Sequence, residues 1–444
     1  MKRLPLEGVR VLDATLVWAG PYATQILADW GAEVIRVESI SHIPAVTRVV
    51  TNDPYDTSLD GGWWLSYPNR DPGEMPWNRL AYFNVHARNK LSMTVDLTEP
   101  EGLRIFKRLI EISDVFIENN VPQTTEKLGL TYEELRRVRG DIIVVRMPGF
   151  GLSGPYKNYR MYGNHAENLV GHAYIRGYTD DNLSDELTTF VSDALGGLNG
   201  AVAALLALRH RRRARKGQLV EVPQAEAMTC YLPEPILDYL MNRRIHSTLG
   251  NRHRSMAPHG CYPCKGQDRW VVISVSSDDE WQALVDALGN PAWSREPKFS
   301  TVLSRHKHQD ELGRLISEWT CQRDPYEVMH IFQHHGVTAG PVMDDHDAYS
   351  DPHVRAREFF NSVTHADCGT NLYPGLMWKQ SNHPNRIRIP PCRLGEHNEY
   401  VYKGLLGVSK GKYEHLKREG HIGTSYTSVS RPASKERGWT EYES

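Results

Sequence analysis

The stretch Phe190–Gln218, FVSDALGGLNGAVAALLALRHRRRARKGQ, contains the element around which the rest of the chain is organised. Its middle, Gly200–Leu208, is rich in alanine and leucine and predicts a buried helix. The basic run His210–Lys216 follows, where the helix dipole favours cations. One carboxylate, Asp193, precedes the predicted helix beside small residues. The local pattern leaves two interpretations of this acid open: an N-cap of the helix, or a group that glycines leave open to close approach.

Composition excludes several classes of protein. The chain has 444 residues, enough for two or three domains, with 40% hydrophobic and 24% charged residues, as in soluble globular proteins. Its formal net charge of -2 provides no global basic field for nucleic acid. The opening residues lack the apolar region of a signal peptide, and no uninterrupted apolar run approaches the roughly 20 residues that span a bilayer. We therefore expect a cytoplasmic protein that binds neither nucleic acid nor membrane.

Histidine and cysteine spacing indicates no metal centre. The 20 histidines are scattered and never form a ligand pattern such as HExxH. The six cysteines are expected to be reduced thiols. Cys261 and Cys264 form a CxxC without a second pair at zinc-site distance, so a β-hairpin position is favoured over metal or redox chemistry.

The first forty residues predict a βαβ unit. Val9–Asp13 is a short apolar run that ends in an acid, which is typical of a parallel strand. A Gly-Pro turn, a helical segment that stops at Gly31 and a second apolar run follow. The loop Trp18–Pro21 would lie where open α/β sheets bind ligands, at a helix N-terminus, although a purely structural turn is the alternative. GxGxxG is absent. Strand and helix keep alternating to Met147, so we expect an α/β fold with a doubly wound, Rossmann-like sheet.

A second set of elements begins after residue 240. Strand patterns near residues 262–263 and 270–276, and helical patterns beyond them, indicate a smaller α+β domain inserted before the chain returns to the first. We expect a large domain of residues 1–240 plus 341–422 and a small domain of residues 241–340. Residues 423–444 are polar and serine-rich and are expected to form a tail.

Several ordered stretches resemble one enzyme family. The opening LEGVRVLDATLVWAGPYATQILADWGAEVIRVE is followed in order by NKLSMTVDLTEPEG, DVFIENNVP, EKLGL, GFGLSGPY, SDALGGLNGAVAALLALRHRRRARKGQLVEV, GVTAGPV and LGEHN. In this order they resemble the family III CoA-transferases, the CaiB/BaiF group, over about residues 4–408. The resemblance implies an interlocked-ring dimer with a large doubly wound domain and an inserted small domain. The partner could be a second copy or a related subunit.

The resemblance also implies a reaction. CoA would pass from an acyl-CoA donor to a free carboxylic acid through an aspartyl anhydride and an aspartyl thioester. The family's nucleophile corresponds to Asp193. Gly196 and Gly197 are candidates to support the substrate, through backbone N–H groups that would stabilise the oxyanion. No tightly bound cofactor is implied, and the CoA thioester is a co-substrate.

The CoA contacts of the family can be carried over by position. The corresponding residues are Trp18, Ala19, Val95, Asp96, Leu97, Thr98, Asn119, Asn120, Val121, Lys127, Arg160, Met161 and Tyr162. Lys127 stands where the family has Arg, and Arg160 where it has Lys, so a cation is retained at both. Ser39 stands where formyl-CoA transferase has Arg. One phosphate contact is therefore in question, and Arg36 is the candidate to compensate.

Two other functions compete with CoA transfer. The fold also occurs in α-methylacyl-CoA racemases, which use the His of a Gly-His-Asp motif. Here the matching residues are Gly163-Asn164-His165, so Asn164 replaces the base unless His165 substitutes for it. The second alternative is a scaffold subunit of a hetero-oligomeric CoA-transferase.

Three features keep two interpretations each. Glu167 either contacts substrate or forms a structural hydrogen bond. The basic run from His210 either binds phosphate or is a solvated helix end. The aromatic stretch Trp63–Trp77, with Trp18, either favours a bulky acyl group such as an arylsuccinate, with succinyl-CoA as donor, or packs in the core.

Overall fold

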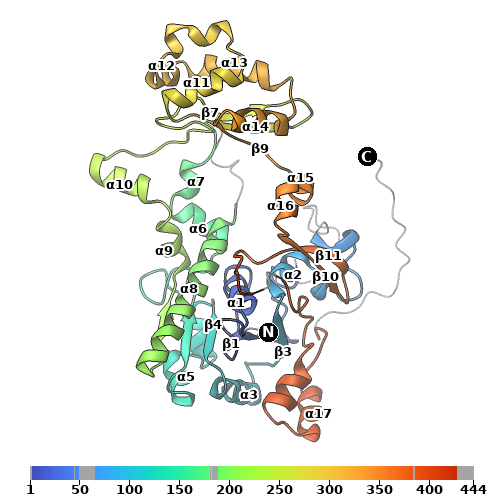
Figure 1. The fold of residues 1–444 in the computed structure, drawn as a ribbon. Helices are drawn as coiled ribbons and strands as arrows, with labels where there is room; N and C mark the ends of the chain where they lie inside the picture. The colour runs from blue at the N-terminus through green and yellow to red at the C-terminus, as the bar shows by residue number, and fades with distance from the viewer. Residues whose placement is uncertain are drawn as a thin grey trace. The chain divides into compact units, whose positions relative to one another are not determined.

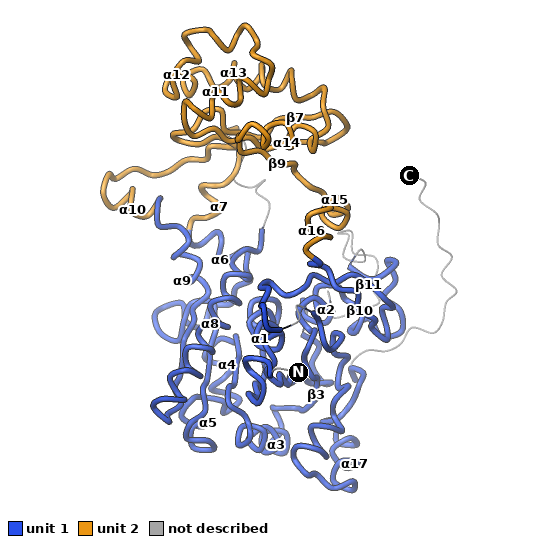
Figure 2. The backbone as a smooth tube through the Cα atoms, viewed as in Figure 1, with its two compact units in different colours: residues 1–170, 188–234, 358–444 blue, residues 171–187, 235–357 orange. Residues whose placement is uncertain are grey.

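The computed structural model describes residues 3–44, 46–49, 66–180, 182, 189–383 and 386–427. The chain forms two compact units, coloured separately in Figure 2. Unit 1 contains Met1–Val170, Thr188–Glu234 and Glu358–Ser444. Unit 2 contains Gly171–Leu187 and Pro235–Arg357, and the small domain expected at 241–340 falls within it.

Unit 1 is built on a six-stranded parallel sheet (Figure 1). The strand order is β3-β2-β1-β4-β5-β6. The strands are β1 Arg10–Asp13, β2 Glu33–Glu38, β3 Lys90–Thr94, β4 Val115–Glu118, β5 Ile143–Arg146 and β6 Leu219–Glu221. In the register, Val11 of β1 is paired with Val34 of β2 on one side and Val115 of β4 on the other. The order reverses between β1 and β4, so the carboxyl ends of these two strands form the switch point where such sheets bind ligands.

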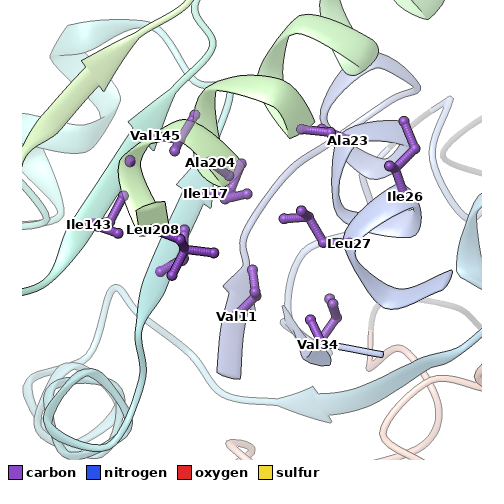
Figure 3. Close-up of a cluster of buried hydrophobic side chains, with 14 of the residues drawn as sticks. Val11, Ala23, Ile26, Leu27, Val34, Ile117, Ile143, Val145, Ala204 and Leu208 are labelled. Atoms are coloured by element: carbon purple, nitrogen blue, oxygen red, sulfur yellow. The ribbon is translucent and has the colours of Figure 1, made fainter. Parts of the chain in front are cut away.

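Helices cover both faces of this sheet. On one face α1, Ala19–Asp29, packs along α8, Val191–Ala214. Leu27 of α1 and Ala204 of α8 belong there to one cluster of buried side chains with the strand residues Val11 and Ile117 (Figure 3). On the other face α3, Pro100–Glu111, packs through Phe106 on strand residue Phe116. The alternation of strand side chains between two buried faces explains their near-continuous apolar sequence. The remaining helices of this unit are α2 Ala81–Ala87, α4 Pro122–Lys127, α5 Tyr132–Val138, α6 Gly163–Leu169, α9 Gln224–Thr229, the π-helix η7 Tyr400–Leu405 and α17 Lys410–Arg418.

Smaller elements complete unit 1. An antiparallel pair, β10 Phe360–His365 and β11 Gly369–Pro374, belongs to it, as do the 3-10 turns η2 Pro68–Arg70 and η3 Pro76–Asn78. The tail expected from Gly423 begins with a packed segment: Tyr426 is buried against Trp77. Residues 428–444 lie outside the described residues.

Helix α8 begins earlier than its composition suggests. It starts at Val191 rather than near Gly200, and Phe190 precedes it with a left-handed backbone at φ 54°. Asp193 is the third residue of the helix, so its interpretation as the N-cap is wrong. Within the described part of the chain, α8 is the one helix long and apolar enough to cross a membrane, but half of its apolar window is buried inside the structure. It is a core helix of unit 1.

Unit 2 has its own antiparallel sheet, in the order β7-β8-β9. Its core joins Val271 and Ile273 of the sheet to the helices, through residues such as Leu284, Phe299 and Phe332. The hairpin of β7 and β8 carries the CxxC, as expected. The elements are α7 His172–Ile175, α10 Pro233–Asn242 (which crosses the unit boundary), β7 His259–Pro263, β8 Trp270–Ser274, α11 Asp278–Ala287, η5 Ala292–Arg295, η6 Pro297–Phe299, α12 Val302–Lys307, α13 Gln309–Thr320, α14 Pro325–His334, β9 Thr338–Pro341, α15 Asp345–Ser350 and α16 Pro352–Ala356.

Candidate active site

Asp193 lies where the N-termini of two helices meet. It is in the first turn of α8 and only 7% exposed. Its carboxylate accepts a hydrogen bond from the N–H of Ala19, the first residue of α1. Trp18, the N-cap residue of α1, makes no side-chain cap, so α8 supplies the acceptor that this helix N-terminus needs. Burial raises the pKa of Asp193 to about 6, the Ala19 N–H lowers it, and the charge of Glu167 raises it.

Glycines let the backbone approach this carboxylate. A Cβ atom on Gly163 of α6 would lie 2.0 Å from Asp193 Oδ2, and one on Gly197 would lie 2.7 Å from the Ala19 carbonyl oxygen. A Cβ on Gly196 would meet Gln224 at 3.3 Å and Ala19 at 3.6 Å. The close approach of α8 to α1 therefore depends on residues without side chains.

The expected role of Gly196 and Gly197 as oxyanion donors does not fit this geometry. Both residues lie beyond the first turn of α8. An N–H at such a position is hydrogen-bonded to the carbonyl four residues earlier in the helix. These two glycines are packing residues that let α1 lie against α8. The N–H group at the carboxylate is that of Ala19, at the start of α1.

Glu167 is brought to the same place by α6. It is four residues after Gly163, so the two share one face of the helix, and it is 1% exposed. Its Oε2 accepts hydrogen bonds from the Thr189 hydroxyl at 3.0 Å and the Thr189 N–H at 3.4 Å. The structural hydrogen bond considered for Glu167 therefore exists, and its charge also acts on Asp193.

The loop before α1 holds a buried donor. Trp18 packs against Phe190 and Tyr82, with ring centroids 4.7 and 5.2 Å away. Its indole Nε1 is buried and has no hydrogen-bond partner among the described residues. Val17 has a positive φ of 62°, which is strained for a β-branched residue, and its N–H donates to Thr47 Oγ1 at 2.9 Å. This loop is thus fixed in place and holds one buried donor that has no partner among the described residues.

A buried ion pair under this loop was not predicted. Lys90 Nζ donates to Asp13 Oδ2 at 3.0 Å, to the Pro21 carbonyl at 2.8 Å and to Thr24 Oγ1 at 2.7 Å. Burial raises the pKa of Asp13, but Lys90 and Arg36 outweigh it and hold it at about 2. The pair ties the end of β1 to the first turn of α1. A charged Lys at the start of a buried strand was the signal in the sequence.

A cavity of about 250 Å³ opens at the switch point of the sheet. Four of the expected CoA contacts line it, namely Val95, Leu97, Thr98 and Asn120. The other lining residues are Ala14, Leu16, Arg36, Val37, Glu38, Ser39, His42, Pro44, Phe116, Glu118, Thr124, Thr125, Leu128 and Leu130. Asn119 fixes the backbone of the lining residue Leu16. Its Oδ1 accepts from the Leu16 N–H and its Nδ2 donates to the Leu16 carbonyl, both at 2.8 Å.

The comparisons with known proteins decide the family. The family model described as CoA-transferase family III matches residues 6–398. The chain belongs to CoA-transferase family III. Succinyl-CoA--D-citramalate CoA-transferase of Chloroflexus aurantiacus is 31% identical over 412 residues, which cover 91% of this chain and 95% of that protein. The succinyl-CoA--L-malate CoA-transferase beta subunit of that organism is 31% identical over 407 residues, 91% of this chain and 95% of that subunit.

A solved structure agrees with this family. The crystal structure of a CaiB/BaiF family protein from Brucella suis is similar to this chain with a TM-score of 0.77 at 26% identity, covering 91% of this chain and 100% of that one. Both the central parallel sheet and the small antiparallel sheets match this architecture. The mixed α/β fold expected from the sequence is confirmed.

Arg36 cannot stand in for the family's missing arginine at Ser39. It is 2% exposed and pairs with Asp13 at 3.6 Å and Glu38 at 3.0 Å. Glu38 is in turn bound by Arg48 at 2.6 Å. The guanidinium of Arg36 is therefore paired with buried carboxylates, although its side chain borders the cavity.

The remaining carried-over positions lie outside the cavity lining. Asp96 accepts from Ser41 Oγ at 2.6 Å and from the Thr98 N–H at 2.9 Å, so it shapes the loop after β3. Met161 packs on Gly149, where a Cβ would lie 2.6 Å from its Cγ. Lys127 is exposed at the end of α4. Val121 is half-buried before α4, and the exposed side chains of Arg160 and Tyr162 precede α6.

Several other candidates have structural roles. In the basic run, Arg211 pairs with Asp114 at 2.7 Å and Asp141 at 3.6 Å, while its neighbours Arg212 and Arg213 are exposed at the helix end. His165 caps α6: its Nδ1 accepts from the Tyr162 N–H at 3.2 Å.

The aromatic stretch Trp63–Trp77 contains buried core residues as well as residues outside the described ranges. Trp77 and Tyr67 are buried in core clusters of unit 1, so core packing accounts for them. Trp63 and Trp64 lie outside the described residues. In unit 2, Asp344, His346 and Asp347 lie within metal-ligand distance of one another, but Arg269 forms ion pairs with both carboxylates.

Proposed function

We propose that the protein transfers CoA from an acyl-CoA to a free carboxylic acid, with Asp193 as the covalent nucleophile. The observation that carries the proposal is a buried carboxylate with a raised pKa, which accepts a hydrogen bond from the N-terminal N–H of α1. A burial-raised pKa makes the carboxylate more basic, and a nucleophile of this kind gains reactivity with basicity. At neutral pH the group is still mostly ionised.

The reaction divides into four balanced attacks. A carboxylate oxygen of Asp193 attacks the thioester carbon, the C–S bond breaks, and an acyl-aspartyl anhydride and CoA thiolate result. The thiolate attacks the γ-carbonyl of Asp193, which releases the donor acid as a carboxylate and leaves an aspartyl-CoA thioester. The acceptor carboxylate attacks that thioester and releases the thiolate again. The thiolate then attacks the acceptor's acyl carbon, which forms the new acyl-CoA and restores the Asp193 carboxylate.

Each attack places negative charge on a carbonyl oxygen beside α1. The N–H of Ala19 already points at the carboxylate, and a helix N-terminus favours developing negative charge. We assign to this N-terminus the stabilising role that the sequence assigned to Gly196 and Gly197. The strained backbone at Val17 and the Lys90–Asp13 ion pair hold the N-terminus of α1 in place before substrate binds.

CoA is proposed to occupy the switch-point cavity. The apolar and amide groups of Val95, Leu97 and Asn120 suit the nucleotide. The exposed cations Lys127 and Arg160 are proposed to meet its phosphates. The remaining positions carried over from the family contribute loop backbone or walls along the path to Asp193: Trp18, Ala19, Asp96, Thr98, Asn119, Val121, Met161 and Tyr162. No tightly bound cofactor is required, because the CoA thioester enters and leaves as substrate.

Succinyl-CoA is the proposed donor and a dicarboxylic acid the proposed acceptor. Support comes from the names of two relatives, which use succinyl-CoA with D-citramalate or L-malate. The case for an aromatic acid is weaker than the sequence suggested, because Trp77 and Tyr67 are core residues.

Racemisation is the competing chemistry, and the contacts of α6 disfavour it. Asn164 occupies the position of the racemase base, and the ring of its neighbour His165 is engaged in capping the helix. Proton exchange at Cα of a 2-methylacyl-CoA in deuterated water tests it. Proton exchange at Cα without CoA transfer would favour racemisation over CoA transfer as the function.

An interlocked dimer is proposed as the working form. Apolar side chains on and after α10 are exposed in the single chain, namely Leu237, Leu240, Met241 and Ile245, and exposed apolar side chains close together in the chain favour a protein partner. A hetero-oligomer stays open, because relatives of this chain include both subunits of a succinyl-CoA--L-malate CoA-transferase. Light scattering of the purified chain distinguishes a homodimer from a chain that needs a second subunit.

The decisive experiment looks for the covalent intermediate. The purified protein is incubated with succinyl-CoA and a panel of dicarboxylic acids, and acyl-CoA products are identified by mass spectrometry. Hydroxylamine added during turnover should convert Asp193 to a hydroxamate, which peptide mass spectrometry locates. Transfer without any modification at Asp193, or full activity in Asp193→Ala, would refute the assignment.

A further inference from the structure

A second buried carboxylate lies against the proposed nucleophile. Glu167 and Gly163 occupy one face of α6, four residues apart. The Gly163 end of that face contacts the Asp193 carboxylate, since a Cβ there would lie 2.0 Å from Oδ2. Placing two carboxylates on facing, buried helix surfaces is unfavourable, yet Glu167 is 1% exposed and Asp193 only 7%.

Glu167 is anchored to the segment that carries Asp193. Its Oε2 accepts from the hydroxyl and the N–H of Thr189, at 3.0 and 3.4 Å. Thr189 lies four residues before Asp193 and directly before Phe190, where α8 is entered through a left-handed residue. The contact therefore fixes the Glu167 charge relative to the first turn of α8.

Two other helices bring a polar group to Asp193. From α1 comes the Ala19 N–H, which lowers its pKa. The uncharged amide Gln224 of α9 lies beside Gly196, three residues further along α8. From α6 comes Glu167, which raises the pKa in addition to burial. The titratable groups at the start of α6, Tyr162 and His165, contact each other in the helix cap.

We propose that Glu167 is a positioning residue that keeps Asp193 nucleophilic by holding a fixed negative charge beside it. The proposal rests on Asp193 being the nucleophile of the proposed function. A carboxylate held near a like charge binds a proton or an acyl carbon more strongly than one in a neutral site. The like charge disappears for Asp193 when it is acylated, so the repulsion is relieved as the anhydride forms.

The test compares two variants over a range of pH. Glu167→Gln keeps the size of the side chain and an oxygen that can accept from Thr189, but it removes the charge. Thr189→Val keeps the charge and removes the hydroxyl hydrogen bond. Formation of the acceptor's acyl-CoA in a single turnover with succinyl-CoA and a dicarboxylic acid is measured from pH 4.5 to about 8.5, a range that spans the titration of raised carboxylates. Circular dichroism and thermal unfolding confirm that each variant is folded.

In the wild type we expect an acid limb with a midpoint near pH 6, the raised pKa of Asp193. In Glu167→Gln the midpoint should fall by roughly half a pH unit, so that the ratio of rates at pH 5 and pH 8 rises about threefold. The rate on the plateau should fall, because the carboxylate is less basic. Thr189→Val should leave the midpoint within about 0.2 units of the wild type, since it retains the charge.

Two results would overturn the proposal. A Glu167→Gln midpoint equal to that of the wild type, with rates lowered evenly at every pH, would show that Glu167 is only structural. A wild-type rate that shows no acid limb down to about pH 4.5 would overturn it without any variant. Failure of the proposed function itself has a different signature, because the wild type would then form no acyl-CoA product or Asp193→Ala would form it normally.

Discussion

The Cα of Gly163 and the carboxylate of Asp193 are in direct contact: a methyl group on Gly163 would lie 2.0 Å from Oδ2. No real Cβ atom tolerates such an approach, so the first residue of α6 sets where the carboxylate of α8 can lie. The Ser192 hydroxyl reinforces the same contact by donating to the Gly163 carbonyl at 2.8 Å. The start of α6 thus sets the position of the proposed nucleophile by steric contact.

The first prediction follows from this contact. Gly163→Ala should displace the Asp193 carboxylate and lower the rate of CoA transfer roughly 100-fold or more, because a shift near 1 Å removes the attack geometry. Steady-state kinetics with succinyl-CoA measures the effect. Gly411→Ala is the matched control, since nothing lies within 4 Å of a Cβ at that position of α17. Equal activity in both variants would show that Asp193 needs no such placement.

The second prediction separates activity from stability at Asp193. Because the folded pKa of about 6 exceeds the ordinary 3.8, the folded state holds a proton more tightly, and the ionised form destabilises the fold above pH 6. Asp193→Asn should therefore abolish transfer while raising the free energy of unfolding by up to about 3 kcal/mol at pH 7. The gain should vanish as the pH falls below about 4. Denaturant unfolding at both pH values checks this, and a variant less stable than wild type at pH 7 would contradict it.

The third prediction concerns the unpartnered indole of Trp18. Trp18→Phe removes a buried N–H that has no partner among the described residues, so the free protein should lose only the packing of the larger ring on Phe190 and Tyr82. A ligand oxygen that accepts from this group would lose its bond, and KM for acyl-CoA should rise about fivefold or more. Trp270→Phe is the control, because its indole donates to Asp268 at 2.8 Å outside unit 1. An unchanged KM would mean that the indole faces no substrate.

The fourth prediction addresses the ion pair under the loop. Lys90→Met removes the nearer of the two cations that pair with the buried Asp13 carboxylate and leaves Arg36 at 3.6 Å, which should cost about 3 kcal/mol of unfolding free energy. Adding Asp13→Asn removes the under-compensated charge and should recover part of that loss. Chemical denaturation of the two single variants and the double variant gives the coupling energy. Additive losses would show that the two residues act independently of each other.

The sequence predicted the layers of the fold well because the strands are buried on both faces. Runs such as Val9–Asp13 and Asp141–Met147 are mainly apolar, with their charged residues near the ends, and such runs separated by amphipathic helices specify a parallel doubly wound sheet. The start of α8 was missed because Ser192, Gly196 and Gly197 are weak helix formers. Tertiary packing on Ala19 and Tyr22 overrides that propensity, since Gly196 and Gly197 allow the close approach.

The candidate site was predictable only in part. Val95, Leu97, Thr98 and Asn120 follow the carboxyl ends of strands, a position that topology brings together at the switch point. The state of Arg36 depended on which carboxylates the register places beside it, and Glu38 and Asp13 are those partners. Glu38 lies two residues after Arg36 on the same strand, but Asp13 meets Arg36 only across adjacent strands, which sequence spacing cannot reveal.

Taken alone, the stretch Phe190–Gln218 determined that a small-residue helix carries one acid near its start and cations at its end. Only the tertiary structure decided what surrounds that acid. The Ala19 N–H donates to it from another helix, Gly163 contacts it, and Glu167 adds a second negative charge nearby. The physical reason is that propensity and dipole effects act along one segment, whereas burial, desolvation and like-charge repulsion depend on distances between segments that only the folded chain brings together.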